Sequence, residues 1–231
     1  MLRLRHLRGS GTNRQAVCLR NHTDSLSVKR PALDKRNERG QATRENIIAV
    51  ATRLFTQKGY ADTSTELVLQ TCEISRGALY HHFANKEALF TAVLEALETE
   101  VTTQVVAAAQ KENNPLDALR TGCIAWLSQA REPAVRQIAL IDAPSVLGWQ
   151  AWRDIDNKHA LGLIKSALGA AAAAGSIRES QVEMFAHMLI AMLGEIALLI
   201  ARSDDTDASL RSGQEAVQQL LSRLFGPNAQ N

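Results

Sequence analysis

The sequence predicts an all-α protein, in which a small three-helix domain precedes a larger helical body. Hydrophobic residues make up 45% of the chain and aromatic residues only 4%, because alanine and leucine supply most of the apolar content. Only five prolines occur in 231 residues, and runs of β-branched residues are few. In successive segments, apolar residues recur at spacings of three and four, which is the period of an amphipathic helix.

Residues 1–40 mix polar and basic residues without apolar periodicity, so we expect them to be disordered. Residues 1–44 hold eleven Lys/Arg and three Asp/Glu, whereas the remaining residues hold fifteen and twenty-one. The net charge of +2 is therefore the sum of a basic extension, residues 1–44, and a mildly acidic remainder of the chain. Any attraction of the body to a polyanion must then be local.

The first predicted helices follow this extension. Order is expected from about Thr43, because apolar residues then recur with helical spacing at Ile47, Ile48, Ala51, Leu54 and Phe55. Gly59 is well placed to end this helix. The next three helices are expected to end at about Thr71, Phe83 and Lys111. The stretch Thr63-Ser64-Thr65 offers an N-cap for the first of them, Ser75 can cap the second and Asn85 the third.

The second body begins after the break at residues 112–115. Its predicted helices span roughly 116–130, 134–142, 148–174, 181–202 and 207–225. Between them stand helix-breaking or capping residues at 132–133, Pro144, 175–176 and 204–207.

Two short helices joined by a tight turn, packed on a preceding helix, form a helix-turn-helix layout at about residues 64–83. Leu79 and Phe83 are four residues apart and are expected to anchor the second helix on its neighbours. The opposite face then carries Arg76, Gly77, Ala78, Tyr80, His81 and His82. Arginine can bond guanine with two hydrogen bonds, and small residues permit close approach to a base. The pattern therefore predicts recognition of double-stranded DNA through the major groove.

Residues 43–90, TRENIIAVATRLFTQKGYADTSTELVLQTCEISRGALYHHFANKEALF, resemble the DNA-binding domain of the TetR family of transcriptional regulators. The resemblance assigns residues 41–101 to that domain, and it places DNA contacts at Ser64, Thr65, Arg76, Gly77, Ala78, Tyr80, His82 and Lys86. Where the family usually has Ala-Gly-Val in the turn, this chain has Cys72-Glu73-Ile74. If Glu73 adopts the left-handed conformation of that glycine, we expect a cost of ~1 kcal/mol.

Because a DNA-binding domain is expected to follow them, residues 1–40 have three possible interpretations. They are an inert tail or the product of a wrongly assigned start codon, a basic arm that strengthens non-specific DNA binding, or a targeting segment.

Residues 102–231 are expected to bind a small, mostly apolar effector. Candidate pocket residues are Trp126, Trp149, Trp152, Met184, Met188 and Met192, with Asp142, His187 and Glu195 as polar groups. The alternative is that the methionines belong to the core, and that Glu183 and His187 form a surface ion pair.

Helices 181–202 and 207–225 are expected to form a homodimer interface, because helix 181–202 is apolar on more sides than one subunit core needs. The apolar residues behind this expectation are Leu189, Ile190, Leu193, Ile196, Ala197 and Ile200. Gly194 and Ala197 are expected to let the partner helix approach closely. The resemblance implies the same pairing of the last two helices, and a dimer suits a palindromic operator.

No catalytic constellation, metal site or cofactor motif is found, so we expect a regulator and not an enzyme. The three cysteines, Cys18, Cys72 and Cys123, are far apart in the sequence and suggest no disulfide framework. We therefore expect the protein to function in the reducing cytoplasm. The apolar run at 184–201 carries His187 and Glu195 and is interpreted as a buried helix, not a membrane span. The alternatives are an effector-independent regulator or activator with the same DNA-binding domain, or a helical enzyme.

Overall fold

The structure, a computed structural model, describes residues 32–225 of the 231-residue chain, with side chains from residue 37 onward. Within these residues the chain is helical without strands, which confirms the predicted fold class. The elements are α1 (Ala32–Lys58), α2 (Thr65–Cys72), α3 (Arg76–His82), α4 (Lys86–Ala109), α5 (Pro115–Gln129), η1 (Val135–Asp142), α6 (Ala143–Val146), α7 (Trp149–Ala173), η2 (Glu179–Gln181), α8 (Val182–Arg202) and α9 (Thr206–Phe225).

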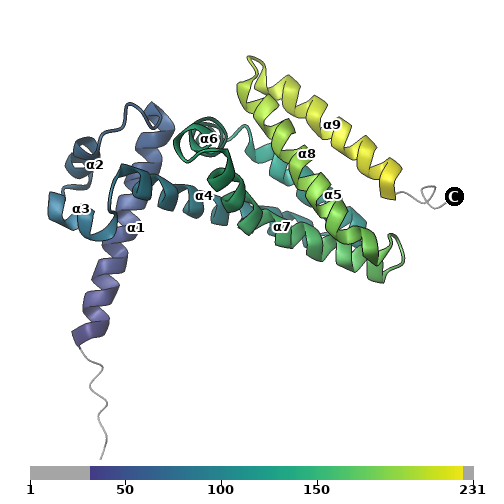
Figure 1. Cartoon of the computed structure of the whole chain (residues 1–231), viewed down its shortest axis with the longest axis horizontal. Helices are drawn as coiled ribbons and strands as arrows, with labels where there is room; N and C mark the ends of the chain where they lie inside the picture. The colour runs from purple at the N-terminus through teal and green to yellow at the C-terminus, as the bar shows by residue number, and fades with distance from the viewer. Residues whose placement is uncertain (1–31, 226–231) are drawn as a thin grey trace, which may run out of the picture.

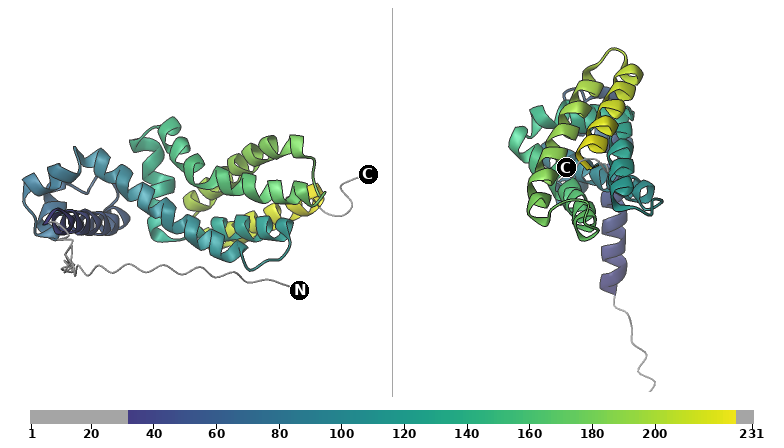
Figure 2. Two further views of the ribbon diagram at one scale, coloured as in Figure 1. Left: turned by 90° about the horizontal axis from the view of Figure 1, so that it is seen from below. Right: turned by 90° about the vertical axis from the view of Figure 1, so that its right-hand side faces the viewer.

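The helices form two lobes joined by α4 (Figure 1). Helices α1 to α3 make the smaller lobe, and α5 to α9 make the larger one, with α8 and α9 side by side. Helix α4 starts in the small lobe and continues into the large one, where it packs against α5 and α7 (Figure 2). A movement within the large lobe can therefore reach the small lobe along one rigid element.

Helix α1 begins at Ala32, eleven residues before the expected start at Thr43. Residues 32–42 lack apolar periodicity, but most of them are good helix formers such as alanine, leucine, lysine, arginine and glutamate. Residues 32–40 were therefore wrongly included in the disordered extension. The rest of that prediction, for residues 1–31, lies outside the described residues.

A wide-turned π-helix, η1, occupies the segment that was expected to be an ordinary helix ending near Asp142. The helix also continues past Pro144, which lies in the first turn of α6, where proline removes no needed hydrogen bond. The expectation that Pro144 interrupts the helical conformation is therefore wrong. The π-helix matters for function because η1 packs against α1, α4 and α8 and so touches both lobes.

One stretch among the described residues, Glu179–Arg202, is long and apolar enough to cross a membrane by length and composition, with a mean hydropathy of 2.1. Half of its most apolar window is buried inside the protein. Helix α8 packs against α5, α7 and α9, and its buried side chains belong to the continuous core. Its composition therefore matches that of a core helix.

Candidate nucleic-acid interface and effector cavity

The helices of the small lobe begin at the caps that the sequence predicted. Ser64 Oγ accepts a hydrogen bond from the Leu67 amide at 3.1 Å, and Ser75 Oγ accepts one from the Ala78 amide at 3.2 Å. Asn85 Oδ1 accepts from the Ala88 amide at 2.7 Å. Each cap satisfies an amide that would otherwise lack a partner in the first helical turn, which fixes where α2, α3 and α4 start.

The turn between α2 and α3 is closed by Glu73 in the left-handed conformation, with φ 54° and ψ 40°. It is the only non-glycine residue with positive φ among the described residues. The Ile74 amide donates to the Leu69 carbonyl at 3.2 Å, and the Glu73 amide donates to the Gln70 carbonyl at 3.4 Å. This is the Schellman pattern, in which glycine is the usual residue. Glu73 thus adopts the left-handed conformation of the family's usual glycine, which was the condition for the expected cost.

Helix α3 is anchored by Leu79 and Phe83, which are buried as expected. Val68 of α2 is buried in the same hydrophobic core, and α2 packs against α1. The opposite face of α3 stays exposed, and Tyr80 keeps 43% of its surface open. The anchors thus present one face of α3 to the outside, as a recognition helix requires.

Seven of the nine residues that we expected to contact DNA lie on α2 or α3. The other two are Ser64, the N-cap of α2, and Lys86, the first residue of α4. Five are exposed: Ser64, Arg76, Gly77, Tyr80 and His81. Four are half-buried: Thr65, Ala78, His82 and Lys86. The structure therefore brings the predicted residues together on one lobe.

Arg76 forms an ion pair with Glu66 of α2, with Nη2 2.8 Å from Oε1 and both side chains more than half exposed. Hydrogen bonds from the backbone of Glu66 itself and from Thr65 hold the pKa of the Glu66 carboxyl below its usual range, and Arg76 adds to this. The guanidinium is therefore already oriented across the gap between α2 and α3. Before it can bond a base with two donors, it must leave or share Glu66.

His82 lies behind this face, with its ring centroid 5.2 Å from that of His81. Burial lowers the pKa of His82, and the neighbouring charges of His81 and Arg44 lower it further. His82 is consequently neutral at pH 7, and it can act there as a hydrogen-bond donor but not as a fixed positive charge.

Lys86 lies at the joint between the lobes. Its ammonium is 4.1 Å from the ring centroid of Tyr60, and it donates to the Ala61 carbonyl at 3.4 Å. Burial lowers the pKa of Lys86, while Asp142 and Asp62 act in the opposite direction. Asp142 Oδ2 in turn accepts a 2.8 Å hydrogen bond from the Tyr60 amide. The C-terminal residue of η1 is thus bonded directly to the start of the loop between α1 and α2.

The large lobe contains a cavity of about 510 Å³ between α4, α5, α7 and α8. Most of its walls are apolar, including Val105, Leu119, Ile164 and Leu193, and Trp126 contributes a ring. The Cys123 thiol also faces it, but burial raises the pKa of this thiol to about 12, so it stays protonated. The size and lining suit a small, mostly apolar molecule.

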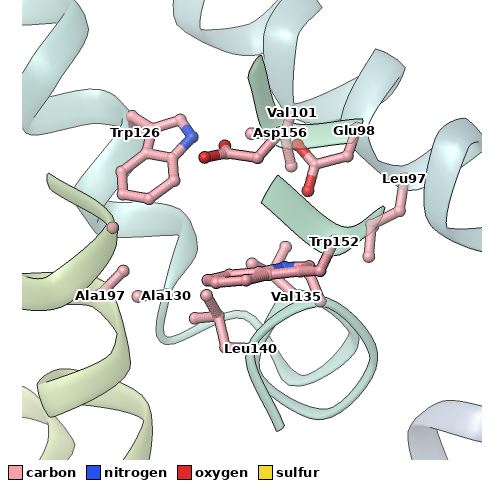
Figure 3. A pocket seen from close by; sticks show the side chains of 12 residues that line it. Leu97, Glu98, Val101, Trp126, Ala130, Val135, Leu140, Trp152, Asp156 and Ala197 are labelled. Atoms are coloured by element: carbon pink, nitrogen blue, oxygen red, sulfur yellow. The ribbon is translucent and has the colours of Figure 1, made fainter. Parts of the chain in front are cut away.

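A smaller recess of about 20 Å³ shares Trp126 and Asp156 with this cavity. Figure 3 shows the carboxyl groups of Glu98 and Asp156 extending into the recess, with the rings of Trp126 and Trp152 on other sides. Burial raises the pKa of Asp156 to about 6, against the opposing effect of Arg153. Burial raises the pKa of Glu98 to about 8, and the charge of Asp156 adds to this.

Only two of the nine predicted effector-binding residues, Trp126 and Trp152, line these two spaces. Asp142 bonds to Tyr60 instead, and Trp149 is 57% exposed beside Trp152. Four of the expected residues on α8 are exposed and do not line either space: Met184, His187, Met188 and Glu195. His187 forms an ion pair with Glu183, with Nε2 3.1 Å from Oε1. Met192 packs against the core. The expected residues of α8 therefore do not line these two spaces, because α8 turns a different face, with Ile190 and Leu193, to the cavity.

The residues that sequence reasoning missed are Glu98 and Asp156. Each interrupts an apolar stripe: Leu94, Leu97 and Val101 surround Glu98 on α4, and Trp152 and Ile164 share the stripe of Asp156 on α7. An ionisable residue in the buried register of a helix is the signal that could have found them.

Two family models match the chain. Residues 47–93 match the model described as bacterial regulatory proteins, tetR family, and residues 116–224 match the model described as tetracyclin repressor-like, C-terminal domain. The first covers the helix-turn-helix, and the second covers the lobe that holds the cavity.

Curated relatives match over only part of this chain. The transcriptional regulator AcrR of Shigella flexneri is 34% identical over 87 residues, which is 37% of this chain and 40% of AcrR. The regulator UidR of Escherichia coli K12 is 37% identical over 62 residues, 27% of this chain and 32% of UidR. Alignments with the first curated relatives thus span a quarter to two fifths of their length.

Solved structures match over most of the chain. A TetR-family transcriptional regulator from Pectobacterium atrosepticum is 31% identical with a TM-score of 0.74, covering 81% of this chain and 96% of that one. AibR, solved in complex with isovaleryl coenzyme A and operator DNA, shares the fold with a TM-score of 0.54 and 24% identity, over 80% of this chain and 99% of AibR.

Proposed function

The chain belongs to the TetR family of transcriptional regulators, and from this membership we propose that it is a cytoplasmic repressor that a small, mostly apolar effector releases from its operator. The observation that carries the proposal is the capped α2–α3 pair, whose anchors turn Arg76, Gly77 and Tyr80 outward. Such a face can enter a major groove without rearrangement of the small lobe.

Arg76 is the residue best suited to direct base readout, because it is exposed near the N-terminus of α3 and carries a planar pair of donors. Gly77 and Ala78 beside it leave room for a base edge. Tyr80 and Lys86 can donate to phosphates, Lys86 after its ammonium turns away from the Tyr60 ring. Readout and positioning are thereby divided among different side chains.

Homodimerisation through α8 and α9 is part of the proposal, but through other residues than those expected from the sequence. Leu189, Ile190, Leu193, Ala197 and Ile200 are buried within the subunit, and Ile196 packs against its core. Gly194 faces Arg153, whose Nη1 lies 2.8 Å from where a Cβ would stand. These residues are used inside one subunit because α5, α7 and α9 all pack on α8.

The outer faces of the same two helices carry the exposed apolar side chains, namely Met184, Met188, Leu199, Leu220 and Leu224. Met184 and Leu199 keep 65% and 62% of their surface open. Packing this face against its copy would form a four-helix bundle and remove the apolar surface from water. A two-fold dimer would set two α3 helices on successive half-sites of a palindrome.

Release by an effector is supported by the cavity and by the contacts of η1. Leu140 of η1 lines the recess beside the cavity, and Asp142 of the same element bonds to Tyr60 in the small lobe. A ligand that changes the recess would shift η1 and, through it, the lobe that carries α3. AibR, which shares the fold, binds both a small molecule and operator DNA.

The test is a mobility shift on the DNA upstream of the protein's own gene, with wild type, Arg76→Ala and the matched control Arg178→Ala. We expect Arg76→Ala to weaken operator binding by ~1–3 kcal/mol and to relax specificity at one base pair in each half-site. Arg178 lies in the loop between α7 and α8, far from α3 (Figure 1), so its loss should leave operator binding unchanged. Equal binding by wild type and Arg76→Ala would overturn the proposed interface. In a reporter strain, deletion of the gene should raise transcription from the operator, and a fall would identify an activator.

A further inference from the structure

The recess beside the large cavity is lined by acidic side chains that outnumber the basic groups near them. Two carboxyl groups, from Glu98 and Asp156, extend into it (Figure 3). One guanidinium lies near them: Arg153 Nη1 is 3.5 Å from Asp156 Oδ2. Its other neighbours are the rings of Trp149 and Trp152, at 5.9 and 5.8 Å from their centroids. Arg153 therefore balances Asp156 and leaves Glu98 without a counter-charge.

Glu98 has no hydrogen-bond or ion-pair partner in the described part of the chain. Its neighbours on α4, Leu97 and Val101, are buried and apolar. An ionised carboxylate in such surroundings loses hydration without compensation, and this is why burial raises its pKa to about 8. The folded protein thus keeps an acid in the wall of the recess beside the large cavity, although a leucine would pack there at lower cost.

The geometry defines what could satisfy Glu98. The recess, at about 20 Å³, has room for one small polar group, and two of its lining residues, Trp126 and Asp156, also line the large cavity. The rings of Trp126 and Trp152 are faces that attract a cation. The 510 Å³ cavity behind it offers apolar walls for a hydrocarbon body.

Resting on the proposed effector site, we infer that the effector is a lipophilic amine, whose ammonium group enters the recess beside Glu98 and whose apolar body fills the large cavity. An anionic ligand such as a carboxylate would meet two acids there and be repelled. A neutral ligand would gain the apolar contacts and, if it carries a hydroxyl, a hydrogen bond to Glu98, but it would leave Glu98 without a counter-charge.

Binding of an ammonium group is coupled to ionisation of Glu98. The charged groups that face it are Asp156 and Arg153 of α7, whereas the linings from α5, η1 and α8 are not ionisable. At pH 7 the Glu98 carboxyl is mostly protonated, so amine binding releases a proton to solvent. Amine affinity therefore rises with pH up to about 8 and levels off above it, while the amine itself stays charged until ~10.

The test is isothermal titration of the full-length protein at pH 8.5 with three probes of equal length: n-decylammonium, n-decanol and n-decanoate. We expect n-decylammonium to bind at least about tenfold more tightly than n-decanol, since a charge-assisted hydrogen bond adds to the same apolar contacts. n-Decanoate should bind most weakly. Glu98→Gln should abolish the preference for the amine and keep n-decanol affinity, whereas Glu100→Gln, an exposed change on the same helix, should alter neither.

A second measurement needs no variant. Titration of wild type with n-decylammonium at pH 7, in two buffers of different ionisation enthalpy, should show close to one proton released per ligand bound. Absence of proton release, or n-decanol binding as tightly as the amine, would overturn the inference and leave the cavity as an effector site for another class. If none of the three probes binds, the proposed effector site itself fails, and the inference with it.

Discussion

The left-handed residue between α2 and α3 offers a direct test of how this helix-turn-helix is built. Glu73 closes α2 at φ 54°, with the paired hydrogen bonds of a Schellman cap around it. We predict that Glu73→Gly stabilises the folded protein. Glycine has no Cβ to clash with the following carbonyl, and both cap hydrogen bonds come from the backbone, so they are kept.

The expected gain in unfolding free energy for Glu73→Gly is the difference between two opposing contributions. A residue with a Cβ in the left-handed region is destabilised by ~1–2 kcal/mol. The greater freedom of glycine in the unfolded chain offsets ~0.4–1 kcal/mol of the gain. The net stabilisation is therefore ~1 kcal/mol, which in a protein of this size raises the melting temperature by ~2–4 °C.

The assay is thermal unfolding followed by circular dichroism at 222 nm, at one protein concentration for all variants. Glu73→Gln is the matched control, because it removes the charge but keeps the Cβ and hence the strained conformation. Its melting temperature should stay close to wild type. If Glu73→Gln gained as much as Glu73→Gly, charge and not backbone strain would be the cause, and an unchanged Glu73→Gly would refute the reasoning altogether.

Three further predictions concern the large lobe and the joint. The pKa of Glu98 rises from 4.5 to about 8 on folding, so the folded state holds a proton that the unfolded chain has released and stability falls as pH rises between these values. Glu98→Gln should accordingly melt at a higher temperature than wild type at pH 8.5 and at the same temperature at pH 4; a constant difference across pH would contradict this. Met188→Glu with Leu220→Glu should convert a dimer to folded monomers in sedimentation, because both side chains are exposed in the subunit, and a variant that stays dimeric would place the interface elsewhere. Asp142→Ala should lower stability by ~1–2 kcal/mol in a denaturant titration, since the Tyr60 amide loses its charged acceptor, and a change below about 0.5 kcal/mol would show that water replaces the carboxylate.

Charging Ile196 and Leu221 would not test the dimer interface, because Leu221 is 3% exposed and Ile196 packs against the core. A carboxylate at Leu221 would be buried without a partner within one subunit. That change would unfold the protomer before it could report on the dimer.

The sequence alone was enough to locate the small lobe, because its features are local. Caps act within three residues of themselves: those expected at Ser75, Asn85 and within Thr63-Ser64-Thr65 are confirmed, and the structure selects Ser64 from the last stretch. The buried anchors of α3 follow from the four-residue spacing of Leu79 and Phe83 along one helix. For Glu73 the resemblance supplied the reason to consider a left-handed conformation, because the family usually has glycine at this position of the turn.

Only the tertiary structure decided which side of each long helix faces the cavity, the core or the solvent. Helix α8 is apolar nearly all round, so its periodicity could not show that Leu193 faces inward while Met184 and Met188 face outward. Asp142 was expected among the effector contacts and instead bonds to Tyr60, 82 residues away in the chain. Glu98 and Asp156 share a recess only because α4 and α7 pack side by side. Contacts between distant segments depend on how the helices rotate and pack against one another, and this rotation is set by the whole core and not by any one stretch of sequence.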